Sequence, residues 1–210
     1  MIFFGESTTS HLRSRGVLRD GTSTKQVWSD ESGTRMLSSR GLSTPILYPD
    51  TGEYLTISQA CALKKPEFMV LSFGLNGILN FIKDKSLYVN NYHKLIQTVR
   101  DASPDTKIIL QTVYPVRSAT GFSVDTETLN GYIQTLNEWL SEIANTHTGV
   151  ALFDTASVLR DENNLLNAKY DVGDGIHLNA EAYRAVLRYL SEHEWTPIEP
   201  RGESFGYKKT

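Results

Sequence analysis

Short apolar runs alternate along this chain with longer segments in which apolar residues recur every three or four positions. The runs are strand-sized, and several lack polar alternation, as is typical of parallel strands covered by helices on both faces. Runs and helical segments in this order predict an α/β fold with crossover connections. Strands are expected at residues 2–4, 26–28, 68–73, 107–113 and 150–153.

Four segments between these runs predict helices. The clearest apolar stripe consists of Leu129, Ile133, Leu136, Leu140 and Ile143. A second stripe lies within residues 92–99 and stops before Pro104, and a third helix begins after Asn179, a favourable N-cap. A shorter helix begins with the capping-box pattern at Thr56 and ends before Pro66.

The pattern breaks down between residues 33 and 55, which contain Gly41, Pro45 and a turn-like Pro-Asp-Thr-Gly sequence. We interpret this segment as an irregular excursion, with a β-ribbon near the sheet edge. The chain of 210 residues suits one α/β domain. We therefore expect one domain over residues 1–195 and a C-terminal extension over residues 196–210.

Composition narrows the range of partners. The formal net charge is −3, and Lys and Arg are scattered, so no basic face is available for nucleic acid. The apolar runs are far shorter than the roughly 18 residues of a membrane span. The single cysteine, Cys61, is expected to be buried and excludes an intramolecular disulfide. The chain would be secreted or surface-bound if a signal or anchor preceded Ile2, and cytoplasmic otherwise; its oligomeric state is left open.

Candidate chemistry follows the strands, because ligands bind outside the carboxyl ends of parallel strands. Gly5, Glu6 and Ser7 follow the first run, which places the Ser7 hydroxyl at the start of a helix, where an oxyanion could be stabilised. The alternative is that Ser7 or Thr8 only caps this helix. His11, one turn later, is interpreted as a helix-surface histidine, or as a residue at the pocket border.

Two further motifs lie near later strands. Asn76 stands between glycines after the third run, as an amide donor or as part of an ordinary turn. Asp174 lies three residues before His177, so its carboxylate can reach Nδ1 and leave Nε2 free to accept a proton. The alternative is an exposed turn before the last helix. Two of these motifs end strands and the third precedes the last helix, so all three are expected at one edge of the sheet, and their joint occurrence favours a site.

The motifs around Ser7, Asn76 and His177, in this order along the chain, resemble those of the GDSL/SGNH hydrolases. Residues 4–8 are similar to the first block of that family, with Glu6 in place of the usual aspartate. Residues 74–77 are similar to the third block, with Gly77 where aspartate is common, and residues 174–177 match the fifth block without alteration. The resemblance spans residues 2–193 and implies a three-layer α/β/α sandwich with a five-stranded parallel sheet in the order 2-1-3-4-5.

The resemblance also implies the roles of the residues. Ser7 would be the nucleophile, His177 its base and Asp174 the partner of His177. The oxyanion would be bound by the backbone N–H of Ser7, the side chain of Asn76 and a glycine N–H of the second block. Gly33 is assigned because it lies just beyond the second run, at residues 26–28, and Gly41 is the alternative.

The implied activity is hydrolysis of a carboxylic ester through an acyl-enzyme, without a cofactor. Short acyl groups on saccharides or other small esters are favoured, because no long apolar lid is visible. An O-acetyltransferase acting on a glycan and a non-catalytic binding module remain alternatives on the same scaffold. His93, His147 and His193 lack neighbouring ligands at metal-binding spacing, so no metal site is predicted.

Overall fold

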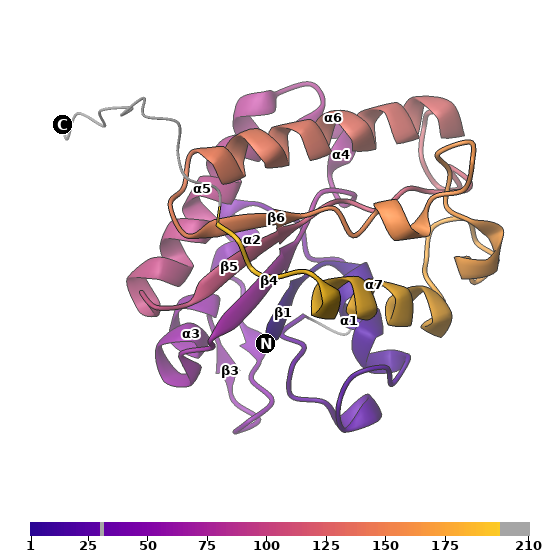
Figure 1. The fold of residues 1–210 in the computed structure, drawn as a ribbon. Helices are drawn as coiled ribbons and strands as arrows, with labels where there is room; N and C mark the ends of the chain where they lie inside the picture. The colour runs from indigo at the N-terminus through magenta and orange to yellow at the C-terminus, as the bar shows by residue number, and fades with distance from the viewer. Residues whose placement is uncertain (30–31, 198–210) are drawn as a thin grey trace.

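A parallel sheet of four strands forms the centre of the computed structural model, which describes residues 1–29 and 32–197 (Figure 1). The strands are β1 (Ile2–Gly5), β4 (Phe68–Ser72), β5 (Lys107–Gln111) and β6 (Val150–Phe153), in the order β1-β4-β5-β6. Four predicted strands are thus confirmed. The predicted extension over residues 196–210 lies outside the described residues from position 198 onward.

The fifth predicted strand, at residues 26–28, is reduced to a single bridge. Val27 pairs in parallel with Phe3, through backbone hydrogen bonds of 2.7 and 2.9 Å on either side. The pairing goes no further because Ser29 Oγ donates to the carbonyl of Gly5 at 2.7 Å, where a ladder bond would continue. The prediction of five strands is therefore wrong by one strand, although Val27 occupies the expected place outside β1.

Helices cover both faces of this sheet, which confirms the three-layer fold class. They are α1 (Ser7–Ser14), α2 (Ser39–Ser43), α3 (Ile57–Lys64), α4 (Ile78–Phe81), α5 (Lys85–Ala102), α6 (Thr126–Asn145) and α7 (Ala180–Glu192), with 3-10 turns η1 (Gly21–Ser23), η2 (Ser157–Leu159) and η3 (Ala168–Tyr170). The predicted caps are present: Thr56 and Gln59 form a capping box, and Asn179 accepts from the N–H of Ala182 at 3.0 Å.

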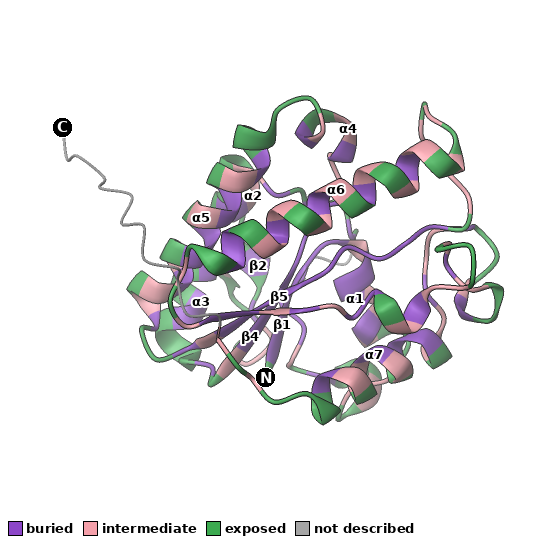
Figure 2. Cartoon of the chain, turned by 45° about the horizontal axis from the view of Figure 1, so that its top comes forward, coloured by how far each residue is buried: buried purple, intermediate pink, exposed green. Residues whose placement is uncertain are grey.

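The two cores lie on opposite sides of the strands, because successive side chains of a strand point to opposite faces. Phe4, Leu71 and Leu110 belong to the core under α3, α5 and α6, whereas Phe3 and Val70 belong to the core under α1 and α7. Figure 2 shows the buried inner surfaces of these helices turned toward the sheet. Figure 1 shows α1 and α7 on the same side of it.

The excursion over residues 33–55 is ordered around a buried arginine. It contains α2 and a hairpin of β2 (Ile46–Leu47) with β3 (Tyr54–Leu55), as the ribbon prediction required. Arg35 is 5% exposed, and its guanidinium donates to the carbonyls of Gly41, Thr44 and Pro45. It also lies 5.6 Å from the centroid of the Phe4 ring. The Arg35 side chain therefore joins the backbone of this excursion to the core next to β1.

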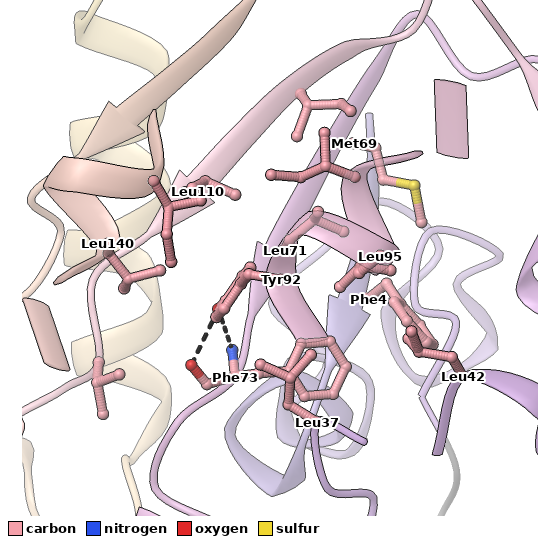
Figure 3. Close-up of a cluster of buried hydrophobic side chains, with 14 of the residues drawn as sticks. Phe4, Leu37, Leu42, Met69, Leu71, Phe73, Tyr92, Leu95, Leu110 and Leu140 are labelled. Atoms are coloured by element: carbon pink, nitrogen blue, oxygen red, sulfur yellow. Dashed lines mark hydrogen bonds between the residues drawn. The ribbon is translucent and has the colours of Figure 1, made fainter. Parts of the chain in front are cut away.

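Two buried tyrosines bind the backbone at the carboxyl end of β4, and Figure 3 shows one of them, Tyr92, bound to Phe73. The Tyr92 hydroxyl donates to the carbonyl of Phe73 at 2.9 Å and accepts from its N–H at 3.1 Å. Tyr88 donates to the same carbonyl at 3.1 Å. Because these bonds satisfy the last backbone groups of the strand, the chain leaves the core at a defined point and enters the loop that carries Asn76.

Two expectations from composition can be compared with the structure. Cys61 is fully buried, with its Sγ 3.8 Å from the Sδ of Met69, so its predicted burial is confirmed. Within the described part of the chain, the helices are all too short or too polar to cross a membrane.

Candidate active site

Ser7 is the first residue of α1, directly after β1. The N-cap position belongs to Glu6, and neither the Ser7 hydroxyl nor its backbone N–H has a hydrogen-bond partner among the described residues. Ser7 is therefore not the N-cap of α1, and neither is Thr8, so the alternative that one of them only caps this helix is wrong. A free hydroxyl and a free N–H stand together at the positive end of a helix.

Gly33 packs directly against Ser7. It is buried and has a φ of +63°, and a Cβ at this position would lie 2.7 Å from both Cα and Cβ of Ser7. Its N–H has no acceptor among the described residues. Gly41, the competing glycine, donates its N–H to Ser38 Oγ at 2.9 Å within α2. The geometry therefore favours Gly33 over Gly41 as a free donor beside Ser7.

Asn76 joins the loop after β4 to the segment that carries Gly33. Its Nδ2 donates to the carbonyl of Gly33 at 2.9 Å and to that of Arg35 at 3.0 Å. Both amide hydrogens are thus engaged with backbone carbonyls rather than directed at Ser7. In this arrangement the amide fixes the position of Gly33.

Glu6 has a structural role that the sequence did not reveal. Its side chain is 3% exposed and accepts hydrogen bonds from the N–H groups of Leu75 and Asn76 at 2.9 Å and of Gly74 at 3.4 Å. Burial raises the pKa of Glu6 to about 7, although the three N–H donors act to lower it. The residue in place of the usual aspartate thus ties the turn before Ser7 to the loop of Asn76. The only signal in the sequence is an acidic residue directly after an apolar strand.

The expected contact between Asp174 and His177 is present. His177 Nδ1 lies 2.7 Å from Asp174 Oδ2, and Oδ1 accepts from the N–H groups of Ile176 and His177 at 2.8 Å. Partial burial acts to raise the pKa of Asp174, but the bonds from His177 and Ile176 together lower it to about 2. The carboxylate is therefore ionised at neutral pH, which favours the proton on Nδ1 of the imidazole and leaves Nε2 as the acceptor.

The loop that carries His177 is fixed by the loop after β5. The carbonyl of Gly175 accepts from the N–H groups of Arg117 at 2.7 Å and Ser118 at 3.1 Å, and its own N–H donates to Asp171 at 3.0 Å. Gly175 has a φ of +84°, and a Cβ here would lie 2.4 Å from Cβ of Ser118. Only glycine permits this close approach.

The predicted segments meet at one edge of the sheet. A small cavity is lined by residues flanking Ser7 and Asn76 and by the residue before His177. Its lining residues are Glu6, Thr8, Ser72, Phe73, Leu75, Val113, Tyr114 and Ile176. The ring of His177 lies with its centroid 4.8 Å from that of His11, one helical turn beyond Ser7 on α1. His177 therefore stands over the face of α1 that begins with Ser7.

No hydrogen bond joins the Ser7 hydroxyl to the His177 ring in the described structure. Such bonds are often long without substrate and tighten in the reacting complex.

Comparison with known proteins identifies the family of the chain. Residues 3–185 match the GDSL-like lipase/acylhydrolase family. The chain belongs to this family. The resemblance predicted from the ordered segments is therefore confirmed.

Individual members of this acylhydrolase group are distant in sequence. A multidomain esterase from Ruminococcus flavefaciens is 26% identical over 127 residues, which make up 60% of this chain and 15% of that protein. The chain thus spans a small part of the length of that relative. The structure named for platelet activating factor from Streptococcus pneumonia has a TM-score of 0.66 at 21% identity, covering 91% of this chain and 81% of that one. Phospholipase A1 from Streptomyces albidoflavus has a TM-score of 0.54 at 14% identity, covering 92% and 98%. At these identities the structural likeness shows the shared fold.

The remaining histidines of this acylhydrolase lie outside the edge that carries Ser7. His93 Nδ1 and His147 Nε2 are 2.6 Å apart between α5 and the end of α6. His193 stacks on Tyr189 with ring centroids 3.7 Å apart. In the described part of the chain, no group of three His, Cys, Asp or Glu side chains is arranged to hold a metal ion.

Proposed function

We propose that this chain hydrolyses short acyl esters, above all acetyl esters of carbohydrates or related small esters, with Ser7 as nucleophile. The observation that carries the proposal is a Ser7 hydroxyl without a partner among the described residues, at the N-terminus of the helix whose next turn packs against an imidazole already bound to Asp174. His177 is the base and Asp174 its partner. Family membership supports the ester bond as the target.

The reaction proceeds in two displacement steps. Ser7 Oγ attacks the ester carbonyl while His177 Nε2 takes the hydroxyl proton, and Asp174 stabilises the imidazolium. The tetrahedral intermediate collapses as the imidazolium gives this proton to the departing alcohol, leaving the acyl group on Ser7. Water then attacks the acyl-enzyme with the same base, and the carboxylic acid leaves.

The oxyanion of each intermediate is assigned to donors that surround Ser7. The N–H groups of Ser7 and Gly33 are free among the described residues, which supports them as the first two donors. Asn76 is the third, and it takes this role by sharing an amide hydrogen that now points to the carbonyl of Arg35 or Gly33. Each such oxyanion donor typically lowers the barrier by about 3–4 kcal/mol.

The preference for a short acyl group rests on the shape of the surroundings. The cavity that borders Glu6, Thr8 and Ile176 has a volume of about 10 Å³, enough for one water but not for an alkyl chain. The other side is open, because the side chains of His177 and Asp174 are 31% and 45% exposed. A small acyl group suits the narrow side, and a bulky polar alcohol such as a saccharide suits the open side.

Covalent labelling tests the nucleophile. The intact protein is treated with a fluorophosphonate and its mass measured, with Ser7→Ala as the variant and Ser14→Ala as the matched control, since Ser14 is an exposed serine of the same helix. We expect one adduct on Ser7 in the wild type and in Ser14→Ala, and none in Ser7→Ala. An unlabelled wild type beside a labelled reference hydrolase would favour the binding-module alternative.

A substrate panel tests the acyl and alcohol groups. p-Nitrophenyl esters of increasing chain length are compared with acetylated xylan, and free acetate is measured beside acetylated sugar. We expect kcat/KM to fall sharply beyond acetate and acetate release to exceed transfer. A rise with chain length would reject the acetyl preference, and dominant transfer to sugar would identify an acetyltransferase.

A further inference from the structure

His11 lies against the proposed base rather than on the open surface of α1. Its ring centroid is 4.8 Å from that of His177, with the ring planes inclined at 55°. The side chain is half-buried, and its Nδ1 is buried without a hydrogen-bond partner. A ring whose buried nitrogen bonds to nothing acts on its neighbour through packing and charge, not through a hydrogen bond.

The surroundings of His11 disfavour the charged form of its ring. Burial lowers the pKa of His11 most, followed by the positive charges of His177 and Arg15, whereas Asp174 acts to raise it. These three are the charged groups that influence His11. Because the interaction is reciprocal, a positive charge at position 11 would oppose protonation of His177.

We propose that His11 is a positioning residue for His177: the His11 ring packs on the imidazole and keeps it in the orientation bound to Asp174. This inference rests on the proposed function, since it assigns a second residue of α1 to the same base. Asp174 holds only Nδ1 of the imidazole, at one edge of the ring. The ring of His11 supplies a second contact, on the ring itself.

Three substitutions separate packing from charge. His11→Ala removes the ring, and we expect kcat to fall about tenfold with KM unchanged, because the free base no longer keeps its reactive orientation. His11→Phe keeps an aromatic ring and loses no hydrogen bond, so we expect kcat within about twofold of the wild type. His11→Lys places a fixed charge about one ring-width from the base, and we expect the acid limb of the pH–rate profile to move down by about half to one pH unit.

The matched control is His193→Ala. His193 also stacks on an aromatic ring, but it lies at the opposite end of α7 from His177. It should retain kcat and the pH profile of the wild type. Circular dichroism and thermal unfolding of all variants report whether each is folded.

Proton NMR supplies a measurement that does not depend on turnover. The Nδ1 proton of His177 should be observed in the wild type and His11→Phe, and exchange faster with water in His11→Ala. Equal exchange and equal kcat in all three proteins would overturn the positioning role, as would an equal loss in His11→Phe and His11→Ala. If fluorophosphonate fails to label wild-type Ser7 while the exchange pattern holds, the proposed function fails and the positioning of the ring stands.

Discussion

Glu6→Gln separates two opposing effects on one buried carboxyl group. Burial favours its neutral form, whereas the N–H groups of Gly74, Leu75 and Asn76 favour the ionised form. The pKa of Glu6 rises from the usual 4.5 to about 7, so burial is the larger effect. This rise corresponds to about 3 kcal/mol of differential stability between the two protonation states.

The sign of the pH dependence follows from this direction. Because the folded state of Glu6 binds its proton more tightly than the unfolded state, the contribution is fully present below pH 4.5 and is lost as pH rises through about 7. Glutamine cannot ionise and shows no such loss. The free energy of unfolding of the wild type, relative to Glu6→Gln, should therefore decrease by about 3 kcal/mol between these limits, which is roughly 6–12 °C in Tm for a domain of this size.

Urea unfolding of both proteins between pH 4.5 and 8 measures this difference. Every other titrating group is common to both proteins, and the fixed cost of placing an amide against the N–H donors does not vary with pH. A difference that stays constant would show that the pKa of Glu6 is not raised by burial. A difference of the opposite sign would show that the N–H donors outweigh burial.

Other substitutions test separate parts of the structure. Gly33→Ala places a methyl group 2.7 Å from Cα of Ser7 at a φ of +63°, so we expect kcat on a short ester to fall about 100-fold or more. Gly41→Ala meets the carbonyl of Met36 at 2.1 Å, so it should lower Tm but leave the kcat of the folded fraction intact; a selective loss of kcat would reinstate Gly41 as the oxyanion glycine. Burial lowers the pKa of His147 to about 4, so stability should fall as pH drops from 6.5 toward 4. His147→Gln should remove about 1–2 kcal/mol of this acid dependence after solvent screening, and an unchanged acid profile would contradict this cause.

Local pattern predicted the elements whose signals are themselves local. The stripe within residues 129–143 became α6, and the caps at Thr56 and Asn179 begin α3 and α7, because spacing and capping depend on neighbours in the chain. The run at residues 26–28 failed as a strand, since Ser29 replaces the next ladder bond with a side-chain bond to Gly5. A three-residue apolar run carries too little periodicity to distinguish these outcomes.

Long-range contacts were the part of the site that the sequence could not reveal. Glu6 accepts hydrogen bonds from N–H groups 68 to 70 positions away, and the periodicity of apolar residues in the sequence does not predict such distant partners. The engagement of Asn76 with two backbone carbonyls likewise depends on where the 33–35 segment returns. The place of His11 had a signal in its spacing from Ser7, but the neighbouring ring comes from a loop more than half the chain away.

The bonds from Glu6 and Asn76 also set the order in which the protein can assemble on the ribosome. Asn76 reaches back 43 positions to Gly33 and its N–H reaches back 70 to Glu6, so the nucleophile end can close once about the first half of the chain has emerged. His177 is made only after β5, α6 and β6, directly before α7. We therefore expect nascent or truncated chains that stop between Asn76 and His177 to carry the serine without its imidazole, and to lack hydrolytic activity until the His177 loop has been made.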